Sequence, residues 1–167
     1  MKSLSNSFFV LLSPTQEIIS DVFFFKRLIW NTIGHSYDGV HSTAHLSLLQ
    51  YEDPHNESLL YTISDKISSF KSFNVRIKNF DFFESNGTIF LDPFNKLDIC
   101  ELRETLVGGS FYPHITIARN LNPKDFNLAW KALKDLPYDK AFTCYCVTVL
   151  KWIERKWQSH INLPLAQ

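Results

Sequence analysis

The sequence predicts one α+β domain built from two similar halves. Stretches with apolar residues at helical spacing are interleaved with short stretches in which apolar and polar residues alternate, as they do in strands. A histidine-bearing strand recurs 69 positions later (114 minus 45), and the start of a hairpin recurs at the same offset, from Phe73 to Phe142. A chain of 167 residues fits one domain, and we place the boundary between its halves near residues 92–95.

The first half carries clear start and stop signals. Ser13 suits an N-cap before Pro14, and Gly34 suits a C-terminal stop, so a helix lies between them. Asn86-Gly87 is a strong hairpin-turn signal. The expected elements are a strand over 7–12, a helix over 14–33, a strand over 44–49, a helix over 59–70, and hairpin strands over 73–78 and 88–91.

The second half shows the same kinds of signal. Gly108-Gly109 ends a helix, and Asn122 caps the next one with Pro123 at its first position. The 69-residue offset carries Asn86-Gly87 onto Arg155-Lys156, where a terminal hairpin would turn. The expected elements are a helix over 97–106, a strand over 112–118, a helix over 123–133, and hairpin strands over 142–152 and 157–163.

Composition excludes several classes of protein. With 45% hydrophobic residues the chain can build a core, and no apolar run approaches the roughly 18 residues that span a bilayer. The chain has 17 basic residues (Lys and Arg) and 17 acidic residues (Asp and Glu). This balance argues against extended binding to nucleic acid through many phosphate contacts. Three cysteines do not form a disulfide framework. We therefore expect a cytoplasmic protein, a monomer without membrane contact.

The two halves repeat a four-residue motif. His45-Leu46-Ser47-Leu48 and His114-Ile115-Thr116-Ile117 each read histidine, apolar, hydroxyl, apolar. Residues two apart in a strand share a face, so each histidine has its own hydroxyl neighbour while the apolar residues face the core. If the halves are related by a pseudo-twofold axis, both pairs face one central cleft.

This constellation suits the chemistry of a phosphodiester. One imidazole can take a proton from the attacking oxygen while the other protonates the leaving oxygen, and an ordinary pKa near 6.5 makes both protonation states available at neutral pH. The hydroxyls of Ser47 and Thr116 can donate hydrogen bonds to the non-bridging oxygens. The chemistry requires no metal, and we expect no cofactor. Which histidine is the acid and which the base stays open.

On these motifs the chain resembles the two-histidine (2H) phosphoesterase superfamily, and within it the 2′-5′ RNA ligase-like cyclic phosphodiesterases. The second motif is the closer match, because Pro113-His114-Ile115-Thr116-Ile117-Ala118-Arg119 is similar to the family's Pro-His-x-Thr-x-x-Arg segment. The first motif departs from the family's usual Phe-x-Gly continuation and runs Leu48-Leu49-Gln50-Tyr51. The resemblance implies a bilobal, duplicated α+β fold with two antiparallel sheets flanking a central cleft and helices packed outside.

The resemblance also implies an activity and a set of site residues. Relatives hydrolyse 2′,3′-cyclic phosphates of nucleotides or RNA ends without metal, and some join RNA through 2′-5′ linkages in reverse. By resemblance His45 and His114 are the catalytic pair, Ser47 and Thr116 bind the phosphate, and Arg119 is a further phosphate contact. Simple alternation places Arg119 on the wrong face, so either the strand ends or bulges near it or Arg119 is a surface residue.

Other functions stay open at this stage. The same cleft would suit a non-catalytic module that binds a nucleotide or an RNA end, and in a plain structural domain both histidines would be incidental. Tyr112 and Tyr51 flank the motif strands and are candidates for stacking on a nucleobase, although packing explains them equally well. The expected partner is a nucleotide or RNA terminus with a cyclic phosphate, without extended binding to nucleic acid.

Overall fold

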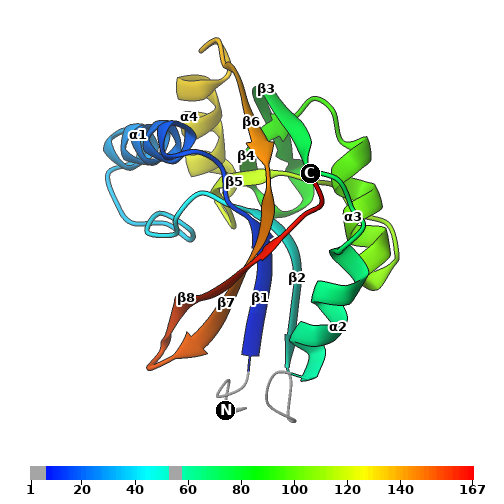
Figure 1. Cartoon of the computed structure of the whole chain (residues 1–167). Helices are drawn as coiled ribbons and strands as arrows, with labels where there is room; N and C mark the ends of the chain where they lie inside the picture. The colour runs from blue at the N-terminus through cyan, green and yellow to red at the C-terminus, as the bar shows by residue number, and fades with distance from the viewer. Residues whose placement is uncertain (1–6, 53–57) are drawn as a thin grey trace.

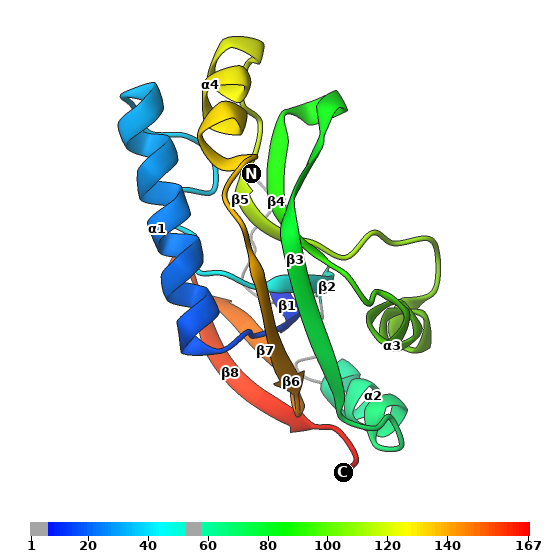
Figure 2. The same cartoon turned by 90° about the horizontal axis from the view of Figure 1, so that it is seen from above.

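The computed structural model describes residues 7–52 and 58–167, which form an α+β fold around one curled antiparallel sheet (Figure 1). Two helix pairs flank the sheet, with α1 beside α4 on one side and α2 beside α3 on the other (Figure 2). The helices are α1 (Gln16–Ile33), α2 (Ser58–Ile67), α3 (Leu97–Val107) and α4 (Pro123–Leu133). The first strands are β1 (Ser7–Leu12), β2 (Leu46–Glu52), β3 (Phe73–Phe83) and β4 (Thr88–Pro93). The later strands are β5 (Ile115–Ala118), β6 (Asp139–Cys144), β7 (Cys146–Ile153) and β8 (Lys156–Pro164).

The strand order within this part of the chain is β6-β3-β4-β5-β2-β1-β7-β8. The two expected sheets are therefore one sheet, because β2 and β5, which His45 and His114 directly precede, are neighbours and pair through Leu46 and Ile115. From this centre the order runs β5-β4-β3-β6 on one side and β2-β1-β7-β8 on the other. The α+β class and the antiparallel pairing are confirmed, whereas the separation into two sheets is wrong.

The ends of α1 are set by local sequence signals and by tertiary contacts. Ile18, Val22 and Ile29 form its buried stripe, and Gly34 ends it in the left-handed conformation with φ 82°. The helix begins two residues later than predicted, with Thr15 rather than Ser13 as N-cap. The Ser13 hydroxyl lies 3.1 Å from that of Thr148 on β7, so Ser13 is used for a tertiary hydrogen bond instead.

The terminal hairpin differs from the prediction in one respect. Residues 142–152 are not one strand, because the chain breaks at the exposed Tyr145. The part before the break, β6, pairs with β3, and the part after it, β7, pairs with β1 and β8. The predicted turn near Arg155 is present, since Glu154 and Arg155 both have positive φ between β7 and β8. No helix in the described ranges is long and apolar enough to span a membrane.

The turn between β3 and β4 joins the sheet to the segment that follows β5. Gly87 has φ 58°, and its carbonyl oxygen accepts a hydrogen bond from the N–H of Leu121. A Cβ at position 87 would overlap the backbone carbonyl of Leu121. Gly34 also has a positive φ, but a Cβ there would meet open space.

We expect Gly87→Ala to lower the free energy of unfolding by about 2 kcal/mol or more, because left-handed strain and a backbone clash add together. Gly34→Ala is the matched control, for which left-handed strain alone predicts a loss of about 1 kcal/mol. Denaturant unfolding of both variants measures the difference. Equal losses would contradict the tight contact between Gly87 and Leu121.

Candidate active site

The pairing of Leu46 with Ile115 sets the geometry of the site. Both residues are fully buried on the core side of the sheet. Extending this antiparallel register by one residue places His45 opposite Thr116 and Ser47 opposite His114. Side chains directly opposite have Cβ atoms about 5 Å apart, and diagonal neighbours are about 7 to 8 Å apart. All four predicted side chains thus share one half-buried surface, which we call the histidine face.

Both imidazoles are oriented in the same way by the backbone. Nδ1 of His45 lies 2.7 Å from the carbonyl oxygen of Thr43, and Nδ1 of His114 lies 2.9 Å from that of Tyr112. A carbonyl oxygen only accepts, so each Nδ1 carries the proton and donates it. Nε2 of each ring is then left to take up or release a proton. The duplicated motif thus reproduces the hydrogen bonding as well as the residue types.

Aromatic rings support each imidazole. Phe9 meets His45 edge to face, with ring centroids 5.1 Å apart. Phe83 meets His114 in the same manner at 5.2 Å, and Phe90 contacts it at 5.2 Å with a tilt. These contacts come from β1 on one side and from β3 and β4 on the other. They restrict the ring orientations that the backbone hydrogen bonds select.

Both β2 and β5 have a β-bulge directly after the hydroxyl residue of the motif. The register of β1 with β2 skips Leu48, and the register of β4 with β5 skips Ile117. These positions are again 69 apart (117 minus 48). Burial follows the bulge in β5, where Ile117 and Ala118 are both fully buried in succession. The alternation of side chains therefore slips by one residue after each bulge.

The bulge in β5 turns Arg119 toward the histidine face. Its positive charge is close enough to lower the pKa of His45, and its Nε donates to Oδ2 of Asp38 at 3.0 Å. The strand ends at Ala118, and Asn120 has a positive φ of 56°. The alternative in which the strand bulges and ends near Arg119 is thus the one observed. More than half of the Arg119 side chain is exposed and accessible to an anion.

The bulge in β2 has the opposite effect on Tyr51. Its ring stacks on the buried Phe8 with centroids 5.3 Å apart, on the face opposite to Phe9 and His45. The structure therefore does not bring Tyr51 to the site. Simple alternation from His45 had placed it there, and the extra residue Leu48 reverses the side. Gln50, which pairs with Phe9, takes its place on the histidine face.

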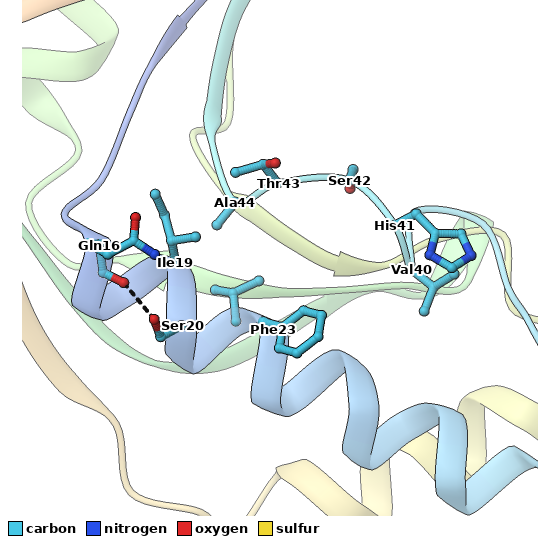
Figure 3. Close-up of a pocket in the computed structure, with 10 residues that line it drawn as sticks. Gln16, Ile19, Ser20, Phe23, Val40, His41, Ser42, Thr43 and Ala44 are labelled. Carbon is cyan, nitrogen blue, oxygen red and sulfur yellow. Dashed lines mark hydrogen bonds between the residues drawn. The ribbon is translucent and has the colours of Figure 1, made fainter. Parts of the chain in front are cut away.

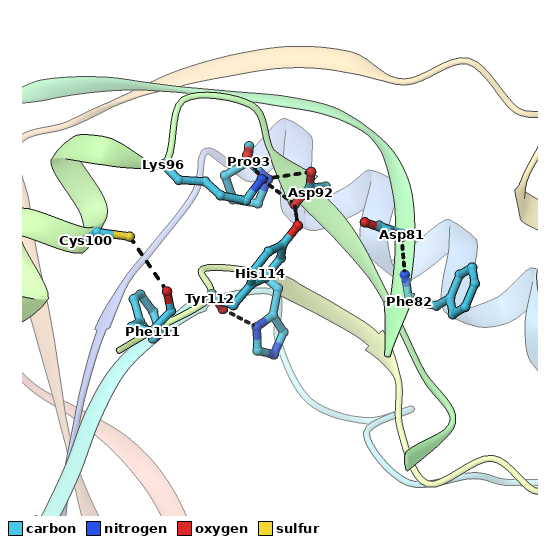
Figure 4. A network of polar contacts seen from close by, with 9 residues as sticks. All are labelled: Asp81, Phe82, Asp92, Pro93, Lys96, Cys100, Phe111, Tyr112 and His114. Atoms are coloured by element: carbon cyan, nitrogen blue, oxygen red, sulfur yellow. Dashed lines mark hydrogen bonds and ion pairs between the residues drawn. The ribbon is translucent and has the colours of Figure 1, made fainter. Parts of the chain in front are cut away.

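Tyr112 lies at the site and is held by a polar network (Figure 4). Its hydroxyl donates to Oδ1 of Asp92 at 3.2 Å, and Nζ of Lys96 lies 4.9 Å from its ring centroid. Lys96 also forms an ion pair with Asp92 at 2.8 Å. Because the Tyr112 carbonyl oxygen accepts the proton of His114 Nδ1, this network fixes the backbone that orients His114. The ring itself is 43% exposed.

Lys26 plays the corresponding part for His45. Its side chain is only 2% exposed, and Nζ donates to the carbonyl oxygens of Gly39 and Ser42 at 2.6 Å and to the Ser42 hydroxyl at 2.9 Å. It thereby ties α1 to the loop that precedes His45. Burial, and then the charge of Arg119, lower the pKa of Lys26 to about 8. At neutral pH the group stays largely protonated.

His45 sits in an environment that disfavours its charged form. Burial lowers the pKa of its imidazole, and the hydrogen bond to the Thr43 carbonyl opposes this change. The positive charges of Lys26 and Arg119 lower the pKa further, and His114 contributes in the same direction. The neutral form of His45 is therefore favoured at neutral pH. The effect of His114 also shows that the two imidazoles interact electrostatically.

Two cavities lie on either side of the loop before His45. One of about 390 Å³ touches His45 and is walled by Phe9, Leu150 and Trp157. The other, of about 430 Å³, lies between the loop and α1, and Figure 3 shows Phe23 and His41 at its lining. Only the first touches a histidine of the motif. No group of three His, Cys, Asp or Glu side chains within 7–52 and 58–167 is placed to hold a metal ion.

Sequence reasoning missed Lys26, Phe9 and Trp157. A signal for Lys26 was present, because it falls on the apolar stripe of α1 between Val22 and Ile29, where a lysine is unexpected. Phe9 and Trp157 carried no comparable signal. Phe9 contacts His45, and Trp157 contacts Phe9 and lines the same cavity, only through the pairing of β1, β7 and β8 with other strands, so neither residue could be assigned from spacing.

We expect Lys26→Met to raise the pKa of His45, because the variant removes a positive charge that repels the imidazolium. Titration of the imidazole by two-bond ¹H–¹⁵N NMR measures this pKa. Lys66→Met is the control, since Lys66 also donates to a backbone carbonyl, that of Leu106, but lies on α2. A pKa of His45 that falls or stays constant in Lys26→Met would contradict the electrostatic coupling.

Comparisons with known proteins identify the family and the fold. The sequence profile of the 2′-5′ RNA ligase superfamily matches residues 30–156 of the chain. A search of curated protein sequences finds no significant match. Among solved structures, E. coli LigT complexed with ATP is similar with a TM-score of 0.73 at 14% identity, over 97% of this chain and 98% of LigT.

Two further solved structures show the same fold. TT0787 of Thermus thermophilus has a TM-score of 0.67 at 14% identity, over 95% of this chain and 97% of its own. Usb1 of Kluyveromyces marxianus has a TM-score of 0.59 at 13% identity, over 97% of this chain and 99% of Usb1. The profile covers most of the chain, and the two histidine motifs lie inside it. The chain is therefore a member of the 2′-5′ RNA ligase superfamily, within the two-histidine phosphoesterases.

Proposed function

We propose that the protein is a metal-independent phosphodiesterase that opens the 2′,3′-cyclic phosphate of a nucleotide or RNA end. The observation that carries this proposal is the Leu46–Ile115 pairing, which places two imidazoles and two hydroxyls on one face. The spacing suits a single phosphate group between the histidines. The solved complexes of LigT with phosphate and with 3′-AMP support a ligand of this class.

The mechanism divides proton transfer between the two rings. Nε2 of one imidazole takes a proton from water as the water oxygen bonds to phosphorus, and Nε2 of the other gives a proton to the leaving ribose oxygen as its bond breaks. Ser47 and Thr116 donate hydrogen bonds to the non-bridging oxygens, and the exposed Arg119 guanidinium adds charge stabilisation. If the 5′-hydroxyl of another RNA attacks phosphorus in place of water and the 3′-oxygen leaves with the transferred proton, the product is a 2′-5′ linkage.

The protein is proposed to contact its substrate at a single phosphate rather than along an extended nucleic acid. A single phosphate can be held by four side chains of the motifs and by Arg119. Binding of this substrate therefore does not require a net positive charge on the protein. We therefore propose a nucleotide or an RNA terminus as the substrate and a monomer as the working form. Tyr112 is proposed to stack on a base, because its half-exposed ring lies beside His114 and is held by Asp92.

His45→Ala and His114→Ala are each expected to lower kcat/KM for 2′,3′-cyclic AMP by about 100-fold or more with the fold intact. Ser47→Ala and Thr116→Ala are expected to cost about 10-fold, the loss of one hydrogen bond to a charged group. The assay is run in EDTA, and circular dichroism monitors folding. His35→Ala is the matched control, because His35 lies at the end of α1 and contacts Asp125.

Full activity in both catalytic-pair variants would refute the proposal. Tight binding of a phosphorylated nucleotide without hydrolysis of any cyclic substrate would instead assign the protein as a binding module.

The pH profile of kcat/KM is expected to be bell-shaped around neutral pH, because one imidazole must be neutral and the other protonated. Lys26→Met raises the pKa of His45 and so identifies its role. If His45 is the base, the acidic limb of the profile moves to higher pH. If His45 is the acid, the alkaline limb moves to higher pH instead. A profile without limbs near neutrality would contradict histidine acid–base catalysis.

A further inference from the structure

A row of aromatic rings runs outward from the candidate active site. Phe9 contacts His45, Trp157 contacts Phe9 with centroids 5.6 Å apart, and Trp152 contacts Trp157 at 5.2 Å. We call Phe9, Trp157 and Trp152 the aromatic row. The members come from β1, β8 and β7 and all are half-buried. The contacts form a continuous path from the phosphate site to the β7–β8 hairpin.

The row lies on the histidine face. Phe9 and Trp157 wall the cavity of about 390 Å³ that touches His45, together with Leu150. Trp152 is two residues after Leu150 on β7 and pairs with Trp157, so it continues the same side of the hairpin. The row thus begins inside the cavity and ends beyond it. The turn of this hairpin lies at an end of the molecule, away from α2 and α3 (Figure 1).

The outer end of the row carries positive charge. Arg155 and Lys156 are exposed at the turn. Lys151 lies on the other face of the hairpin, with its Nζ over the ring of Phe8. Glu154 is the only acidic residue in the segment 151–157. In a chain with no net charge overall, this hairpin end is locally basic. Phosphates of a nucleic acid strand would be attracted there.

The planes of neighbouring rings in the row meet at 52° and 69°, and Phe9 meets the imidazole of His45 at 86°. Such contacts cover an edge or one face of a ring and leave other ring surface open to a base. Stacking of a base on an aromatic side chain contributes about 1 to 3 kcal/mol and tolerates any base. One ring beside the phosphate site would serve a mononucleotide. Two tryptophans and a basic turn beyond it are more than a mononucleotide can contact.

We propose that the aromatic row and the basic β7–β8 turn bind the nucleotides next to the terminal phosphate of a single-stranded RNA. This inference rests on the proposed function and names its substrate class as RNA ends rather than free cyclic nucleotides. Trp157 faces the nucleoside that carries the reacting phosphate, and Trp152 with the turn holds the adjoining part of the strand.

The test compares kcat/KM for 2′,3′-cyclic AMP with that for a short oligoribonucleotide ending in a 2′,3′-cyclic phosphate. The wild type is expected to prefer the oligonucleotide. Trp152→Ala is expected to lower kcat/KM for the oligonucleotide by about 5-fold to 100-fold, the loss of one stacked base, and to leave 2′,3′-cyclic AMP unchanged. Retained activity on 2′,3′-cyclic AMP also shows that the variant folds.

Two further variants sharpen the comparison. Arg155→Ala combined with Lys156→Ala is expected to weaken the salt dependence of the reaction on the oligonucleotide alone. Tyr61→Ala is the matched control, since Tyr61 is an aromatic residue of α2 that is 79% exposed. This variant should leave kcat/KM unchanged for both substrates. Equal kcat/KM for both substrates, unaffected by Trp152→Ala, would overturn the inference while the proposed function stands.

A binding experiment separates the two proposals if neither substrate is hydrolysed, which would refute the proposed function. Calorimetry then compares 3′-AMP with the same oligonucleotide ending in a 3′-phosphate. If the wild type binds the oligonucleotide more tightly than 3′-AMP and Trp152→Ala abolishes this preference, the result would support the aromatic row as an RNA-binding surface. Equal affinities, or a preference that persists in Trp152→Ala, would overturn it.

Discussion

The site depends on one short contact between strands, the pairing of β2 with β5 at Leu46 and Ile115. This pairing joins the two sides of the sheet and fixes which residues lie opposite each other. Because the two motifs meet in antiparallel register, each histidine faces the hydroxyl of the other half. If one of the two strands slipped by one residue, its histidine and hydroxyl would turn into the core and its buried apolar residues would turn to the surface. Burial of Leu46 and Ile115 therefore protects the register of the site.

Around this contact, each histidine is held by a loop that is in turn held by a cation. Lys26 on α1 binds the loop before His45, and Arg103 on α3 donates to the carbonyl oxygens of Gly108 and Gly109 in the loop before His114. Arg103 also donates to the carbonyl oxygen of Leu48, the bulged residue of β2. The loops supply the carbonyl groups that orient the imidazoles, so the two cations help to hold the orientation of both rings.

The two sides of the site are related but not equivalent. His45 is surrounded by Lys26 and Arg119, which favour its neutral form, whereas the surroundings of His114 include the Asp92–Lys96 pair behind Tyr112. The duplicated motif therefore places its two imidazoles in different electrostatic surroundings. Neutral overall charge is compatible with this arrangement, because the positive groups act at short range on a single ring or phosphate.

The sequence by itself determined the helices, the alternating motif strands, the turns at Gly87 and Arg155, and the identity of the histidine and hydroxyl pairs. These features depend on neighbours a few residues away, so spacing and turn chemistry reveal them. The tertiary structure alone decided that the strands form one sheet, that Arg119 faces the histidines and Tyr51 does not, and that Phe9 contacts His45 while Trp157 lines the cavity beside it. Each of these depends on strand pairing and on a bulge of one residue, and long-range register leaves no trace in local periodicity.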